Sequence, residues 1–314
     1  MGVFVFLPLV LPLTALPIAR LAELHLHPRS AARLLTGISA VMALCSTLCL
    51  VLLGVIGTAQ IPGNPLPDSW SDPVVRDVVP FHEVVGFTAI ALLCAVALSC
   101  TVTVRRHLRV RSRARHALAG LPHGRDLAVL PDPDPYAYAL PGLPGRIVVS
   151  TAMLDGLAED ECRALVAHER AHLTHRHHRV LMTNQLASCV NPFLRPLQHA
   201  AAYSTERWAD EEAAQAVGDR RLTARAVANA ALLSHRAAHR PAPTGLAAFA
   251  ASGPVPRRVA ALLGPGPVPG GWPPAHSPVG LAAMIAAAGT AASAISALNA
   301  AVALLLVLKA ATPL

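Results

Sequence analysis

Charged residues are scarce in this sequence. Asp, Glu, Lys and Arg make up 14% of the 314 residues, whereas soluble domains carry about 25%. Aromatic residues are also few, at 4%, while 54% of the residues are hydrophobic. This composition argues against an ordinary soluble domain and indicates a membrane protein.

Paired cysteine motifs are missing. The sequence has six cysteines, but none of them forms a Cys-x-x-Cys pair. Four lie inside apolar runs, and the other two are far apart in a different region. The pattern supports neither a disulfide framework nor a thiolate zinc site. We expect the cysteines to behave as small buried apolar residues.

A general nucleic-acid-binding surface is not indicated either. The formal net charge is +8, but the six arginines of "RRHLRVRSRAR" (105–115) account for most of it and leave +2 for the other residues. No direct binding of nucleic acid is therefore expected.

Long apolar runs are plentiful. A helix that crosses a bilayer needs ~20 mostly apolar residues, and four runs qualify at about residues 3–19, 34–59, 84–104 and 281–308. The first run contains three prolines and lacks the basic start and the cleavage site of a signal peptide. We expect it to be retained as a kinked transmembrane helix.

Positive charge is unequally distributed between the loops. Residues 20–33 carry three arginines and 105–115 carry six, whereas 60–83 has only Arg76 against four acids. The positive-inside rule places 20–33 and 105–280 in the cytoplasm and both termini outside. The expected division is a membrane region at 1–104, a cytoplasmic domain at 105–280, and a fourth span with a short outer C-terminus at 281–314.

The segment between the third and fourth spans should form a small α+β domain. Three strand-like pieces at 126–130, 136–140 and 146–150 are separated by Pro- and Gly-rich turns, which predicts a meander. Helices are expected at 157–178, 199–217 and 220–239, followed by a Pro- and Gly-rich linker at 264–280.

The first of these helices contains "HERAH" (168–172). His168 and His172 are four residues apart, so both imidazoles lie on one helix face and can bind one ion. Glu169, beside the first histidine, can hold water and take its proton, as the general base of a metalloprotease does. The three later histidines, at 175, 177 and 178, are expected to lie at a solvated, basic helix end.

A catalytic zinc ion needs a third protein ligand. "YSTERWADEEAAQA" (203–216) offers Glu206, which lies far enough along the chain for a second helix to return to the first. Asp210, one turn later, could hold the other ring nitrogen of a ligating histidine. Glu211 and Glu212 are expected to be exposed. His199 and Tyr203 are candidates for stabilising an oxyanion.

"HERAH" and "ERWAD" together resemble the gluzincin pattern H-E-x-x-H…E-x-x-A-D of integral membrane metallopeptidases. Two families share that pattern: the BlaR/MecR antirepressors, and the HtpX and CAAX-prenyl-protease family. "AYALPG" and "RIVVSTAMLDGLAEDECRALVAHERAH" resemble the strands and helix that precede the motif in both families. Three spans before the zinc helix and one after it resemble BlaR/MecR. The receptors of that family carry an outer penicillin-binding sensor domain after the fourth span; we expect a short member without it, so β-lactam sensing is not implied.

The resemblance implies an α-helical membrane protein with an α+β gluzincin metallopeptidase domain. It implies one Zn²⁺ bound by His168, His172 and Glu206, with Glu169 as base and Asp210 as support. The expected partners are the lipid bilayer and a protein or peptide substrate, such as a BlaI/MecI-like transcriptional repressor. Two alternatives stay open: an HtpX-like quality-control protease of the membrane, and a non-enzymatic membrane scaffold.

Overall fold

The computed structural model describes residues 5–61, 63, 67, 70, 82–118, 126–143, 145–237, 254–267 and 277–311. Most of the expected outer loop at 60–83, the middle of the expected linker and both chain ends lie outside these residues.

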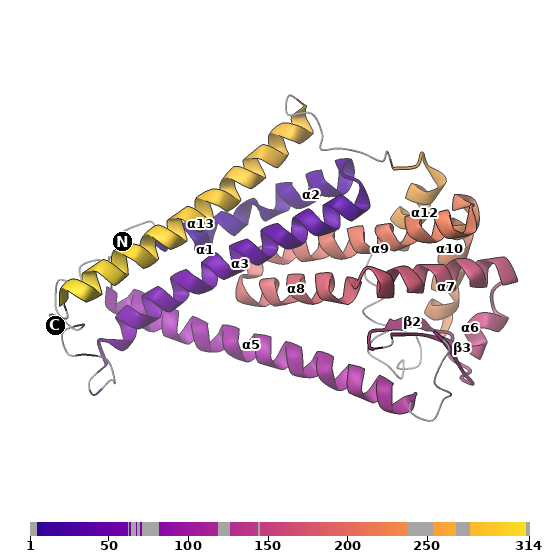
Figure 1. Cartoon of the computed structure of the whole chain (residues 1–314), viewed down its shortest axis with the longest axis horizontal. Coiled ribbons are helices and arrows are strands. Elements are labelled where there is room, and N and C mark those ends of the chain that lie inside the picture. The colour runs from indigo at the N-terminus through magenta and orange to yellow at the C-terminus, as the bar shows by residue number, and fades with distance from the viewer. Residues whose placement is uncertain are drawn as a thin grey trace.

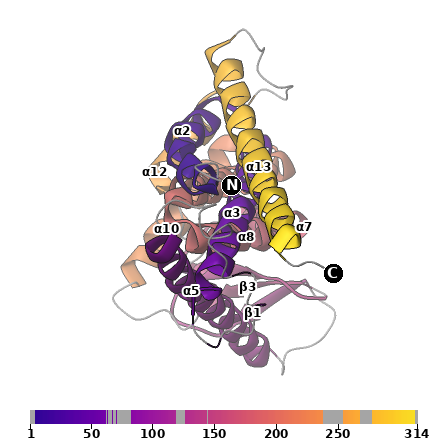
Figure 2. The same ribbon diagram turned by 90° about the vertical axis from the view of Figure 1, so that its left-hand side faces the viewer.

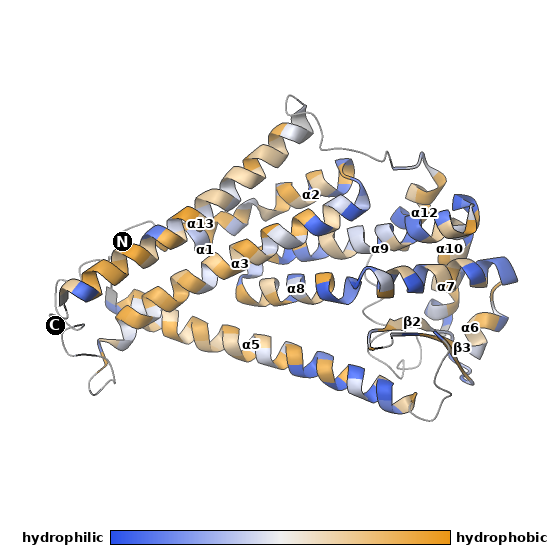
Figure 3. Cartoon of the chain, in the orientation of Figure 1, coloured by the Kyte–Doolittle hydropathy of each residue, from blue (hydrophilic) through white to orange (hydrophobic). Residues whose placement is uncertain are grey.

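Four helical segments are long and apolar enough to cross a membrane (Figures 1 and 3). Three precede the HERAH stretch and one follows it. The first consists of α1 (Leu7–Val10), the 3₁₀ turn η2 (Leu11–Thr14) and α2 (Ala15–His25); the others are α3 (Pro28–Thr58), α5 (His82–Ala117) and α13 (Pro278–Ala311). All four extend beyond the apolar runs. The arginine-rich stretch 105–115 therefore continues α5 as a helix.

The first segment is broken where its prolines remove backbone donors. Pro12 has no N–H to bond the carbonyl of Pro8. The hydroxyl of Ser46 on α3 donates to that carbonyl instead, at 2.9 Å. The Asn191 side chain donates to the carbonyl of Leu9 at 3.3 Å and to Ser46 Oγ at 3.2 Å. These bonds supply the partners that an apolar environment cannot, and they hold the 3₁₀ turn of this segment against α3.

The three predicted strands are confirmed, but their expected order is wrong. β1 (Leu127–Leu130), β2 (Ala137–Leu140) and β3 (Arg146–Ser150) form a sheet of order β1-β3-β2, with β3 parallel to β1 and antiparallel to β2. This is not a meander, because the Pro-rich segment 131–136 crosses the end of β3. The backbone N–H of Ser150 donates to the Tyr136 carbonyl, and that of Ala152 donates to the Asp132 carbonyl.

Helices follow the sheet in close succession. They are α6 (Thr151–Asp155), α7 (Glu159–Thr174), α8 (His177–Val190), the 3₁₀ turn η4 (Pro192–Leu194), α9 (Arg195–Val217), α10 (Arg220–Ala237) and α12 (Val255–Leu263). The helix expected at 157–178 ends early, because Arg176 adopts a left-handed conformation with φ 52°. His177 and His178 therefore begin α8, a helix that was not predicted.

The sheet is covered on both faces. The end of α5 places Ala114 and Leu118 against Tyr138, Leu140 and Val148. The opposite face, with Ile147 and Val149, packs against apolar residues of α6, α7 and α10. Figure 2 shows the sheet beside α5, with α13 on the far side of α3. The third long helix thus forms one wall of the α+β unit.

α8 and α9 pack against the long apolar helices. One apolar cluster joins Leu35 and Met42 of α3 to Ala187 of α8 and Leu197 and Ala201 of α9. α2 and α13 contribute to the same cluster. The helices that follow HERAH and the apolar segments therefore share a core.

α3 and α5 come into backbone contact at two glycines, Gly57 and Gly86. A Cβ atom placed on Gly57 would lie 2.5 Å from the carbonyl carbon of Gly86, well inside van der Waals contact. The crossing therefore requires the absence of a side chain. Gly37, on the same helix α3, has nothing within 4 Å of its added Cβ.

We predict that Gly57→Ala destabilises the purified protein by about 1–3 kcal/mol, the usual cost of overpacking. Gly37→Ala is the matched control and should be neutral or stabilising by up to about 1 kcal/mol, because alanine favours helix. Thermal unfolding of both variants in one detergent measures the difference. Equal unfolding midpoints would contradict the close contact between α3 and α5.

Candidate metal centre

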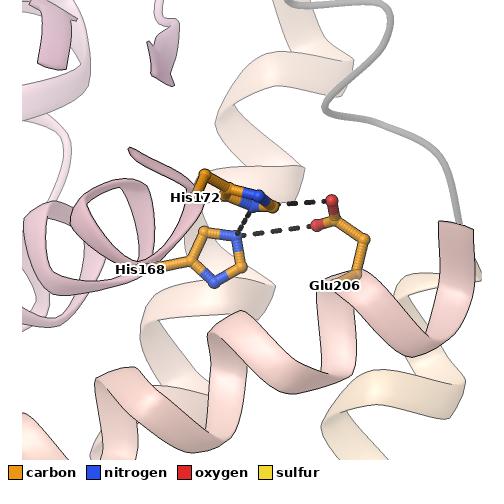
Figure 4. Close-up of side chains that lie close together, drawn as sticks. All are labelled: His168, His172 and Glu206. Carbon is orange, nitrogen blue, oxygen red and sulfur yellow. Dashed lines mark hydrogen bonds and ion pairs between the residues drawn. The ribbon is translucent and has the colours of Figure 1, made fainter. Parts of the chain in front are cut away.

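Two helices bring together the three predicted metal ligands. α7 carries His168 and His172 one turn apart, and α9 runs beside it with Glu206 facing them (Figure 4). The two Nε2 atoms are 3.1 Å apart. Glu206 Oε2 is 3.6 Å from His168 Nε2, and Oε1 is 3.5 Å from His172 Nε2. Among the described residues, these three form the group of His, Cys, Asp and Glu side chains that could hold a metal ion.

The spacing of the donor atoms fits zinc. Ligands at about 2.1 Å from a tetrahedral ion are separated from one another by about 3.4 Å. The observed separations of 3.1 to 3.6 Å lie around that value. Glu206 Oε1 is also buried without a hydrogen-bond partner, which is costly for a carboxylate unless a cation binds it. Two imidazoles and one carboxylate, with a fourth position left for water, form a donor set of catalytic zinc sites.

The Nδ1 atoms of His168 and His172, which point away from the donor set, also have close neighbours. His168 Nδ1 is 3.1 Å from Asp210 Oδ1. His172 Nδ1 is 2.9 Å from Nδ1 of His177. Because a neutral imidazole that offers Nε2 to a metal carries its proton on Nδ1, His172 would donate to His177. Both contacts orient the rings so that the Nε2 atoms converge.

Arg258 also belongs to the site, although the sequence analysis did not identify this residue. It lies on α12, is 7% exposed, and forms two hydrogen bonds with Asp210, at 2.6 and 2.8 Å. Its Nη1 also lies 3.0 Å from Glu206 Oε2. Arg258 is separated from Asp210 by 48 positions and has no motif around it, so no local pattern could have assigned it to the site. Its charge offsets the two buried acids.

The electrostatics of the site favour an added positive charge. Burial opposes protonation of His168, but the neighbouring carboxylates of Asp210 and Glu206 outweigh it and raise its pKa to about 10. Burial lowers the pKa of His172 to about 4, so this ring is neutral. Burial would raise the pKa of Glu206, but Arg258 and the histidines hold it below its usual value.

Glu169 faces a pocket beside the ligands. Its side chain is buried, and burial raises its pKa to about 7, although His168 opposes the rise. The backbone of Ala139, on the edge strand β2, forms a hydrogen bond with it. Glu169, His172 and Glu206 all line the pocket. A carboxylate with a pKa near neutrality is suited to taking and returning a proton.

The expectation for the later histidines was wrong at His177. That residue is fully buried, and burial lowers its pKa to about 2. His175 is half-buried and lies 3.1 Å from Glu212, and His178 lines the pocket. The spacing of His177 from His172 carried no signal, because the chain turns between α7 and α8.

The neighbours of Glu206 also differ in part from expectation. Glu211 is 4% exposed and bonds Arg220, so its expected exposure was wrong. Tyr203 is buried under the guanidinium of Arg257, at 4.3 Å, and His199 is exposed. Neither Tyr203 nor His199 lines the pocket at Glu169. Their part in oxyanion binding stays a prediction.

Trp208 connects the site to the start of α3. Its ring packs against His175 and His177, with centroid distances of 4.5 and 4.6 Å. The guanidinium groups of Arg29 and Arg33 lie 5.5 and 5.3 Å from its ring centroid, within the range of cation–π attraction. His172 is thus supported by His177, which is supported by a side chain that contacts α3.

We predict that Arg258→Gln destabilises the metal-free protein by about 3–5 kcal/mol, because it leaves two buried acids without their cation. Arg257→Gln, the adjacent control, breaks a more exposed pair with Glu23, for which about 0–1 kcal/mol is expected. Chemical unfolding in the presence of a chelator measures both. If Arg258→Gln is no less stable than Arg257→Gln, the ion-pair network is not formed.

The segment that contains the two histidines matches a known family. A family model described as Peptidase family M48 matches residues 103–202. The match includes the end of α5, the sheet, α7, α8 and the start of α9, and it stops before Glu206, Asp210 and Arg258. No curated protein and no solved structure matches the chain.

The match supports a metallopeptidase of the M48 type, a family of zinc-dependent peptidases. It does not separate a BlaR/MecR-like protein from an HtpX-like one. The assignment of Glu206 as the third predicted ligand rests on the geometry of α9 and not on the match.

Proposed function

We propose that this chain is a membrane-bound zinc endopeptidase. The observation that carries the proposal is the convergence of His168, His172 and Glu206 beside the buried Glu169, within a chain whose M48-like segment lies among four apolar helices. A scaffold without activity has no need of a base beside the donor set. We therefore favour an enzyme over a non-enzymatic scaffold.

Each residue has a separate task in the proposed hydrolysis. A zinc ion bound by the three ligands would polarise the peptide carbonyl and acidify water. Glu169 takes a proton from the attacking water and delivers it to the leaving amine. Asp210 and His177 hold the two imidazoles, and Arg258 keeps Glu206 and Asp210 ionised. The Ala139 backbone holds Glu169 close to β2.

The substrate backbone is proposed to bind along β2. This strand is at one edge of the sheet and pairs with β3 on its other side. An extended peptide can add to such an edge through main-chain hydrogen bonds. Tyr138 and Ala139 of β2 line the pocket together with Glu169, so a peptide there would pass the base.

A regulatory role is the proposed biological setting. Three apolar segments precede the zinc helix and one follows, and this order resembles the BlaR/MecR antirepressors, whose substrate is a BlaI/MecI-like repressor. The alternative is HtpX-like quality control, which the M48 match also supports. Cleavage of a co-expressed repressor, compared with cleavage of a misfolded membrane protein, distinguishes the two.

We predict one zinc ion per chain. Elemental analysis of the purified wild type should give a stoichiometric amount, and His168→Ala should lose it, because two donors bind zinc far more weakly than three. His199→Ala changes an exposed histidine outside the donor set and should keep the metal. Full zinc occupancy in His168→Ala would disprove this ligand assignment.

We predict that Glu169→Gln keeps the zinc and loses activity. The amide has nearly the same shape but cannot accept the proton, so peptide cleavage should fall by roughly 100- to 10,000-fold. Glu159→Gln, an exposed position on the same helix α7, is the control and should cleave normally. Loss of zinc from Glu169→Gln, or normal cleavage by it, would show that Glu169 is not the base.

The orientation in the membrane is also a proposal. The zinc site, the arginine-rich end of α5 and the turn between α2 and α3 lie at the same end of the long helices (Figure 1). Because that end carries the cationic residues, we place it in the cytoplasm. Both termini would then lie outside.

We predict that Ser112→Cys, in a chain without its native cysteines, is not labelled in intact cells by a thiol reagent that cannot cross the membrane. Ser112 is exposed on α5, so it should react after the cells are opened. Labelling in intact cells would reverse the orientation.

A further inference from the structure

The pocket at Glu169 extends away from the metal ligands. The pocket is open to solvent, and its empty space, with the adjoining open solvent included, amounts to about 700 Å³. Beyond the catalytic groups, its walls are the end of α7, the end of β2, one face of α8 and a single turn of α5. The side chains of these walls are mostly apolar: Leu173, Leu181, Met182, Tyr138 and Pro141.

The polar members of the lining carry little charge away from the metal ligands. Among the described residues that line the pocket, none is a lysine or an arginine, and the carboxylates, Glu169 and Glu206, lie at the end where the metal ligands are. His178 has its pKa lowered to about 4, by burial and then by Arg111, so it is neutral. Gln185 is uncharged. An acidic substrate side chain would lose its hydration here without gaining an ionic partner, and a basic one would meet a carboxylate only at the end next to the metal ligands.

The shape of the pocket is fixed by structure around it. Arg111 and Arg115 of α5 both donate to the carbonyl of Pro141, at 3.0 and 3.1 Å. Tyr138 is 2% exposed and belongs to the core between the sheet and α5. α8 is held against α3 by the hydrogen bond from Asn184 to Thr36, at 2.8 Å. The walls are therefore preformed.

We infer that this pocket is the specificity pocket of the enzyme, and that it takes a large apolar side chain, such as Leu, Met or Phe, from the residue beside the scissile bond. The inference rests on the proposed function. The catalytic and the apolar parts belong to the same pocket. Its lining includes Glu169, which would act on the scissile bond, and also Leu181 and Met182 of α8. A side chain next to that bond is within reach of α8.

The binding arm of the test uses Glu169→Gln, which does not consume the peptide. Fluorescent peptides that differ only at one central residue, Leu, Ala, Asp or Lys, are titrated against the zinc-loaded variant in detergent. The Leu peptide should bind at least about 10-fold more tightly than the Ala peptide, and the charged peptides more weakly still. Equal affinities for the four peptides would overturn the inference.

The cleavage arm uses the wild type on a mixture of random peptides, with the cut sites read by mass spectrometry. One position beside the cut should be enriched in Leu, Met and Phe. Met182→Trp should fill the pocket and shift the preference towards Ala and Gly. Met182→Ala should enlarge the pocket and improve cleavage beside Phe or Trp. This second variant keeps the test valid if Met182→Trp does not fold.

Leu186→Ala is the matched control for these variants, since Leu186 is half-buried on α8 but does not line the pocket. It should keep the profile of the wild type. Cleavage without any preference, or an unchanged profile in both Met182 variants, overturns the inference and leaves the protease proposal intact. If the wild type does not cleave any peptide but Glu169→Gln still prefers the Leu peptide, the result counts against the proposed protease function and supports the proposed apolar pocket.

Discussion

The burial of several acids in one small space is the constraint on which the rest of the site depends. Glu169, Glu206 and Asp210 are between 0 and 5% exposed, and ionised carboxylates are costly to bury unless they are paired. Arg258 lies against two of them, and His168 lies between the same two. A bound dication would complete the neutralisation. The buried negative charge would thus favour the binding of a metal ion at this site.

α9 is the helix that makes this arrangement possible. Its residues face three environments: Glu206 and Asp210 face α7, Trp208 faces the start of α3, and Leu197 lies in the core shared with α3. A single helix of 23 residues carries all of these contacts. The geometry of the ligands is therefore coupled to the packing of the apolar helices, so a change in how α3 packs would reach the site through Trp208 and His177.

The arginine-rich end of α5 has a structural task in addition to its proposed place on the cytoplasmic side. Arg111 and Arg115 hold Pro141 at the end of the edge strand, and Ala114 packs on the sheet. Long basic side chains can cover apolar surface while their charged ends remain partly solvated. The arginine-rich part of α5, which continues the apolar helix, thus forms one wall of the pocket at Glu169. The proposed substrate site is formed between the α+β unit and this helix.

Local spacing was enough to predict several features from the amino-acid sequence: the i, i+4 histidines with Glu169 between them, Glu206 one turn before Asp210, three short strands, and the four apolar segments. Local periodicity fixes which side chains share a helix face. The order of the strands, the turn at Arg176, and the places of His177 and Arg258 depend instead on how the whole chain folds. Strand order depends on where the segment 131–136 crosses the sheet. Arg258 reaches Asp210 across 48 positions, and a buried charge chooses its partner by proximity in the folded chain, which no local pattern encodes.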